Sequence, residues 1–103
     1  MRHEGLVDTV VHRIADALHP KHVIVFGSQA TGQAGAESGL DLVLVYEGSK
    51  SKREVRREVH ELFEHPQFSL DVFVLTPEEL ETGRKIANTL AREISERGIV
   101  WYG

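Results

Sequence analysis

A segment of small residues between two short apolar runs constrains the fold of this 103-residue chain more than any other feature. The apolar runs cover residues 22–26 and 40–46, and residues 27–39 between them are mostly glycine, alanine and other small residues. Short apolar runs rich in β-branched residues predict buried strands, and glycine with small polar residues predicts a loop. The sequence therefore predicts a strand, a loop and a second strand, with one carboxylate, Asp41, inside the second strand.

Amphipathic helices are predicted on either side of these two strands. Apolar residues recur at helical spacing between residues 3 and 18, and Pro20 ends that run. A second helix is expected to start after Ser51, because Ser51 and Glu54 form a capping-box pattern. Its apolar positions continue to about residue 64.

The C-terminal third is expected to contribute another strand and one long helix. Residues 69–75 form a third apolar run, with Asp71 near its start. Thr76 and Glu79 give a second capping-box pattern directly after that run. Apolar residues at helical spacing then predict a single helix that continues to a C-cap at Gly98.

The order of these elements predicts the fold class. Residues 99–102 follow the last helix as a short, apolar edge strand, so that helices and strands are interleaved along the whole chain. We expect one domain over residues 1–103 with an α+β fold, a two-layer α/β arrangement. In it, helices flank a mixed sheet of three to four strands.

Charge and composition restrict the classes of function. The formal net charge is −4, whereas a dedicated duplex-DNA-binding domain usually carries a basic excess, so we expect no duplex DNA partner. The sequence has no cysteine, which excludes disulfides and thiolate metal sites. No apolar run approaches the length that spans a membrane, and a cytoplasmic location is expected. The six histidines show no spacing typical of a metal site.

The two strand carboxylates are candidate metal ligands. Asp41 and Asp71 each lie near the start of an otherwise apolar run, where an unpaired buried charge would be costly. Such acids occur at strand ends, beside a cation or at functional sites. If the two strands are neighbours, both carboxylates can bind one divalent cation together with substrate phosphates, as Mg²⁺ prefers. The alternative is that both are solvated strand-end residues.

The start of the loop has features of an anion-binding turn. Gly27 follows a strand directly, and glycine allows backbone amides to approach a phosphate closely. The Ser28 hydroxyl can donate to a phosphate oxygen, and Gly32 permits a return turn. A Gly-Ser pair alone is common in ordinary turns, so its meaning depends on the strands and acids around it.

Taken together, these residues resemble the signature of the minimal nucleotidyltransferases of the DNA polymerase β superfamily. The family pattern is G-S…G…S-D-x-D on a strand–loop–strand unit, followed by a third acid on a later strand. The resemblance implies a polymerase β-like nucleotidyltransferase fold and a metal-dependent transfer of a nucleotide. It further implies Mg²⁺ (or Mn²⁺) as the cofactor, bound by Asp41 and Asp71, and ATP as the substrate. By the same resemblance, the nucleotide is held by Gly27, Ser28, Gly32 and Ser38, and the catalytic residues are Asp71 and Asp41.

The chain departs from that family pattern at three positions. Gly39 occupies the place of the first acid, so one expected metal ligand is missing. Gln29 and Thr31 stand where basic residues are frequent in the family. Glu37 lies two residues before Gly39 and is a candidate substitute for the missing carboxylate.

Single-domain chains of this kind resemble the antitoxin (MNT) component of HEPN/MNT toxin–antitoxin pairs. That resemblance implies a protein that moves AMP, or another NMP, from an NTP to a hydroxyl on a HEPN-type toxin partner. Because of Gly39, an alternative is a weak or inactive module that neutralises its partner by binding alone. A third hypothesis is a small regulatory domain that binds no nucleotide.

The basic residues near position 50 and the aromatic residues each have a structural interpretation and, for some of them, a functional one. Basic residues crowd the start of the second helix, where they form either a patch for an acidic ligand or a solvated face balanced by Glu54, Glu58 and Glu61. Trp101 and Tyr102 are expected to cap the core, although they can also anchor an interface. Three phenylalanines in apolar periodic positions are expected in the core: Phe26, Phe63 and Phe73.

Overall fold

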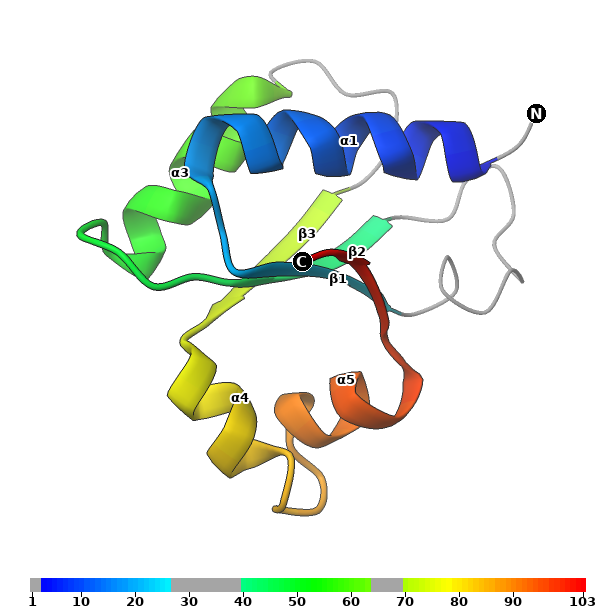
Figure 1. Cartoon of the computed structure of the whole chain (residues 1–103), viewed down its shortest axis with the longest axis vertical. Coiled ribbons are helices and arrows are strands. Elements are labelled where there is room, and N and C mark those ends of the chain that lie inside the picture. The colour runs from blue at the N-terminus through cyan, green and yellow to red at the C-terminus, as the bar shows by residue number, and fades with distance from the viewer. Residues whose placement is uncertain (1–2, 27–39, 64–69) are drawn as a thin grey trace.

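A four-stranded sheet with helices on both faces forms the centre of the molecule (Figure 1). The computed structural model describes residues 3–26, 40–63 and 70–103. The elements, in chain order, are α1 (His3–Leu18), β1 (His22–Phe26), β2 (Leu40–Val45), α3 (Lys52–Leu62), β3 (Leu70–Leu75), α4 (Pro77–Gly83), α5 (Leu90–Arg97) and β4 (Ile99–Tyr102).

The sheet is mixed, with the strand order β3-β2-β1-β4. β1 pairs antiparallel with both β2 and β4, and β2 pairs parallel with β3. The α+β fold with a mixed sheet flanked by helices, predicted from the order of elements, is therefore confirmed. The last strand is an edge strand, also as predicted.

The larger core lies between the sheet and the two helices α1 and α3, which Figure 1 shows above the sheet. Because side chains alternate along a strand, every second residue of β1, β2 and β3 faces these helices. Ile14, Leu42 and Val59 are typical members, each fully excluded from solvent. The buried residues of this cluster are Val7, Val10, Val11, Ile14, Leu18, Val23, Val25, Leu40, Leu42, Leu44, Val55, Val59, Val72 and Val74.

A smaller core lies on the opposite face, between the sheet and the helices α4 and α5, which Figure 1 shows below the sheet. Its buried residues are Ile24, Phe26, Val43, Val45 and Ile94, with Leu75, Leu80 and Leu90 packed against them. Asp41 and Asp71 point to this second face, since each lies two residues before a side chain on that face. The helices cover it less completely than α1 and α3 cover the first.

The capping signals read from the sequence form the expected contacts. The Ser51 hydroxyl accepts from the Glu54 amide at 3.1 Å, and Thr76 and Glu79 make the same contact at 3.1 Å. In both pairs the glutamate side chain accepts from the amide of the capping residue. The starts of α3 and α4 are therefore confirmed.

The prediction of one helix from Thr76 to Gly98 was wrong. α4 ends at Gly83, and α5 begins only at Leu90. Asn88 takes a left-handed backbone with φ 65°, which interrupts a helix, and Thr89 then caps α5 by accepting from the Arg92 amide at 3.1 Å. The apolar spacing continues across the break because both short helices pack on the same sheet face.

The aromatic residues differ in their burial. Phe26 is buried and Phe63 packs against the larger core, as predicted. The expectation that Phe73 lies in the core was wrong, because its side chain is 40% exposed. β3 is an edge strand, so the ring of Phe73 has a neighbouring strand on one side only.

The C-terminal strand places one aromatic residue on the core. Trp101 packs against the larger core, and its indole nitrogen donates to an Asp8 carboxylate oxygen at 3.2 Å. Tyr102 remains 36% exposed. None of the helices in the described ranges is long and apolar enough to cross a membrane.

Candidate functional site

The predicted site residues fall into two groups. Asp41 and Asp71 lie on described strands. The proposed nucleotide-binding residues Gly27, Ser28, Gly32 and Ser38 lie outside the described residues, as do Glu37 and Gly39. The site can therefore be built from the two acids and from the ends of the strands that flank residues 27–39.

The two acids are neighbours in the sheet. Asp41 of β2 and Asp71 of β3 are register partners across the parallel pair, and Asp41 also faces Phe26 at the end of β1. Adjacent strands are about 4.8 Å apart, so the two side chains lie next to each other on the same face. Phe26 and Leu40 are the residues bonded to the two ends of the 27–39 segment. Both acids therefore lie at the sheet edge from which that segment leaves and to which it returns.

Asp71 affects the ionisation of Asp41. Partial burial raises the pKa of Asp41 above its ordinary value of 3.8, and a hydrogen bond with Asp71 and the charge of Asp71 raise it further. Asp41 is partly buried, whereas Asp71 is exposed. A carboxylate whose ionisation is hindered by a neighbouring negative charge is stabilised by a proton or by a cation.

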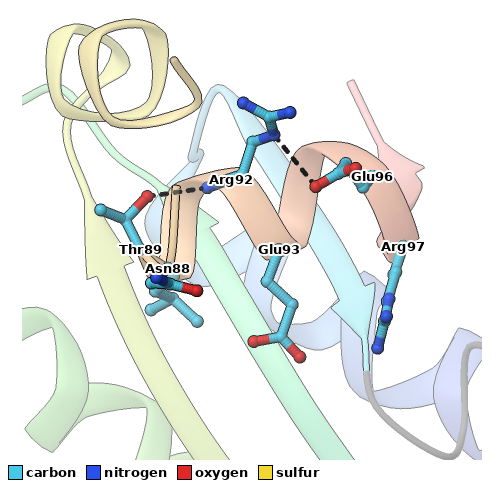
Figure 2. A pocket seen from close by; sticks show the side chains of 7 residues that line it. Asn88, Thr89, Arg92, Glu93, Glu96 and Arg97 are labelled. Carbon is cyan, nitrogen blue, oxygen red and sulfur yellow. Dashed lines mark hydrogen bonds and ion pairs between the residues drawn. The ribbon is translucent and has the colours of Figure 1, made fainter. Parts of the chain in front are cut away.

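A third carboxylate, which no sequence motif indicates, also affects the ionisation of Asp41. The charge of Glu93, on α5, also raises the pKa of Asp41. Figure 2 shows Glu93 and Arg97 extending from the same side of α5, while Arg92 extends from the other side and pairs with Glu96. Glu93 is an exposed helix residue with no distinguishing local motif. Only the placement of α5 across the sheet brings it near the acids.

An open groove runs along α5 beside this region (Figure 2). Its volume is about 560 Å³. The residues that line it are Asn88, Thr89, Leu90, Arg92, Glu93, Glu96 and Arg97. The groove thus has polar walls on the side of α5.

The donor set fits a hard divalent cation. Within the described ranges, no group of three or more histidine, cysteine, aspartate or glutamate side chains is placed to hold a metal ion. Two adjacent carboxylates remain, and Mg²⁺ is often held by one or two carboxylates, with water and substrate phosphates completing its octahedron. Asp41 and Asp71 can therefore supply two of the oxygen ligands of such a cation.

The basic residues at the start of α3 lie apart from this site. Lys50 pairs with Glu58 at 2.6 Å, and Lys52 pairs with Glu79 at 2.6 Å. These contacts agree with the interpretation of a charge-balanced surface. Both lysines follow the C-terminal end of β2, whereas Asp41 lies near its start, so the lysines lie toward the other end of the sheet from the two acids.

Most of the sequence matches one known protein family. The family model described as "Nucleotidyltransferase domain" matches residues 7–100. Among curated proteins, none matches the sequence significantly.

Two solved structures share the fold. One is a candidate nucleotidyltransferase from Sulfolobus solfataricus, with a TM-score of 0.60 and 20% identity over 94% of this chain and 77% of that one. The other is a toxin–antitoxin solved with AMP-PNP, with a TM-score of 0.59 and 14% identity over 93% of this chain and 73% of that one. At these identities the structures show similarity of fold.

Proposed function

The chain belongs to the nucleotidyltransferase domain family, and from this premise we propose that it transfers a nucleotidyl group, AMP or another NMP, from a nucleoside triphosphate to a hydroxyl on a partner protein. The observation that carries the proposal is the register pairing of Asp41 with Asp71 at the sheet edge that anchors residues 27–39. A segment rich in small residues, joined to strands that carry two carboxylates, is suited to bind phosphates and a cation.

The resemblance of the sequence to the family pattern supports a role for each of the candidate site residues. Gly27, Ser28, Gly32 and Ser38 hold the triphosphate, with ATP as the substrate. Asp41 and Asp71 hold Mg²⁺ or Mn²⁺, which neutralises charge on the phosphates. Asp71 is the more exposed of the two acids and acts as the general base that deprotonates the acceptor hydroxyl.

The transfer step is a substitution at the α-phosphorus. The acceptor oxygen forms a new bond to the α-phosphorus as the bond from this phosphorus to the bridging oxygen breaks, and pyrophosphate leaves. The acceptor proton passes to the Asp71 carboxylate. The chain's contribution is positioning and charge, as in phosphoryl transfer generally.

The proposed partner is a toxin of the HEPN type, with the chain acting as its antitoxin in the cytoplasm. Support comes from the similarity of the fold to a toxin–antitoxin solved with AMP-PNP, an ATP analogue. The partner brings the acceptor hydroxyl to the exposed side of Asp71.

A second candidate function rests on Gly39. The family pattern has an acid there, and its loss weakens the metal site. In this case the chain neutralises its partner by binding alone, and the nucleotide site is weak or inactive.

Titration calorimetry with ATP, in the presence and absence of Mg²⁺ or Mn²⁺, tests the proposal. The expected result is metal-dependent binding that is lost in Asp41→Ala and kept in Asp16→Ala, which removes an exposed carboxylate from α1. Absence of heat with any combination of metal and nucleotide would contradict the transfer function. Transfer to the partner that appears only after Gly39→Asp would support the binding-only alternative.

A further inference from the structure

Phe73 lies beside the proposed reaction site and is not used by the mechanism. It follows Asp71 by two residues on β3, so both side chains are on the same face of the sheet. Two residues along a strand correspond to about 6.6 Å. Phe73 is 40% exposed, although three other residues of the same strand, Leu70, Val72 and Val74, pack into or against the larger core.

One side of the Phe73 ring is supported. The centroids of the Phe26 and Phe73 rings are 5.8 Å apart with an interplanar angle of 56°, within the range of favourable aromatic pairs. Phe26 is 8% exposed and is part of the smaller core. Phe73 therefore has a ring that is fixed by a buried neighbour and is open to solvent elsewhere, which suits a stacking surface.

We propose that Phe73 is the stacking platform for the base of the nucleoside triphosphate. The proposal deepens the proposed function and rests on it, because it takes the reacting phosphate to lie at Asp41 and Asp71. One ribose separates the base of a nucleotide from its α-phosphate. When that phosphate lies at the two acids, the distance from the acids to the base is comparable to the spacing from Asp71 to Phe73.

The charges near the site favour a nucleotide whose base points toward Phe73 over a nucleotide bound in the reverse direction. Glu93 adds negative charge on the side of the acids that faces α5. A triphosphate chain directed toward α5 would be repelled, whereas a neutral base is not. The phosphates then extend toward the anchor points of residues 27–39, and the base takes the side of Phe73.

Stacking on a single ring gives a defined kind of selectivity. Every base has a π-face, so a stacking platform binds all bases and favours purines by their larger area. No base-specific hydrogen bond is part of the proposal. We therefore expect ATP and GTP to bind several-fold more tightly than CTP and UTP.

The experiment compares two ligands that differ in the base. Binding of AMP-PNP and of inorganic tripolyphosphate, each with Mg²⁺, is measured by calorimetry for the wild type, Phe73→Leu and Phe73→Tyr. Loss of base–aromatic stacking commonly weakens binding about tenfold. Phe73→Leu is expected to lose about tenfold for AMP-PNP and nothing for tripolyphosphate, and Phe73→Tyr to bind both ligands as the wild type does.

Tyr102→Leu is the matched control, because Tyr102 is an exposed aromatic residue on the opposite edge strand. Nuclear Overhauser effects between the Phe73 ring protons and adenine H2 or H8 give a direct readout that a purely structural role would not produce. Unchanged AMP-PNP affinity in Phe73→Leu, or equal losses for both ligands, would overturn the proposal. So would a wild type that binds no AMP-PNP.

The same data separate this inference from the proposed function. If Phe73→Leu weakens AMP-PNP selectively but no nucleotide reaches the partner protein, base stacking stands and transfer fails. If transfer occurs and depends on Asp41 while Phe73→Leu binds AMP-PNP normally, transfer stands and base stacking fails. An effect of Phe73→Leu only on the KM for the partner would assign Phe73 to the acceptor and overturn the proposal.

Discussion

Replacing Asp41 with asparagine is expected to stabilise the ligand-free protein. Asp41 and Asp71 are register partners on parallel strands, and a partly buried carboxylate beside a second one is unfavourable when both are ionised. Asparagine has nearly the same shape and removes one of the two charges. Its amide can also donate to the Asp71 carboxylate, which an ionised Asp41 cannot do.

The size of the effect follows from the strand spacing. Two unit charges about 5 Å apart repel each other by ~1 kcal/mol or less in a water-like dielectric, and salt reduces this because Asp71 is exposed. We expect a gain of about 0.5 kcal/mol in the free energy of unfolding at neutral pH. For a domain of this size, this corresponds to a rise in Tm of about 2–4 °C.

The gain should depend on pH in a defined direction. The pKa of Asp41 in the folded state lies above 3.8, so the folded protein holds an extra proton in the window just above that value. The contribution of Asp41 to the free energy of unfolding therefore falls as the pH rises through this window, and its whole penalty is present at neutral pH. The advantage of Asp41→Asn should shrink toward zero as the pH falls below about 3.8, where Asp41 is protonated in both states.

Thermal unfolding monitored by circular dichroism, between pH 3 and pH 8, measures this difference. Asp71→Asn should give a similar gain, and the double variant less than the sum, because each substitution relieves the same repulsion. Asp16→Asn is the control, since it removes one exposed carboxylate from α1 and leaves the Asp41–Asp71 pair in place. If Asp41→Asn is less stable than the wild type at neutral pH, the argument from carboxylate repulsion is refuted.

Three further substitutions test the packing and caps, each by urea unfolding. Thr89→Ala should lower stability by about 1–2 kcal/mol, because α5 loses its N-cap, while Thr89→Ser keeps the hydroxyl and most of the stability. Gly98→Ala should cost about 1–3 kcal/mol, because the added Cβ would lie 2.7 Å from the Ile94 carbonyl oxygen. Val59→Ala should cost about 2 kcal/mol, because the side chain is fully buried, while Val100→Ala, exposed on β4, should change stability little.

The elements that the sequence predicted well are those with strong local signals. The starts of α3 and α4 follow from capping boxes that act within four residues, and β1 and β2 follow from short apolar runs next to a segment of small residues. Such signals depend on neighbouring residues, so they can be read without knowing the fold. The break between α4 and α5 has only a weak local signal, because Asn88 and Thr89 are acceptable inside a helix and the apolar spacing continues past them.

The parts of the candidate site that could not be predicted depend on which strands and helices meet. The sequence suggested that Asp41 and Asp71 would converge if their strands were neighbours, and the parallel β2–β3 pairing makes them partners. The approach of Glu93 depends on how α5 crosses the sheet, for which its own residues give no indication. The apolar run around Phe73 predicts a core position, but its side chain is exposed because β3 is an edge strand.

The response of Asp41→Asn to Mg²⁺ and ATP separates the three hypotheses, whereas its stability alone does not. Repulsion between the acids predicts a stabilised variant whether the site is catalytic, inactive or simply structural. A ligand that binds only the folded state adds stability as RT ln(1 + [L]/Kd), so an active site predicts that Mg²⁺ with ATP raises the Tm of the wild type alone. In the wild type, binding of Mg²⁺ and ATP would then offset the destabilisation that the repulsion between Asp41 and Asp71 causes. A binding-only module would show no rise in Tm with Mg²⁺ and ATP but would still bind its toxin after the substitution. A regulatory domain would bind neither nucleotide nor toxin.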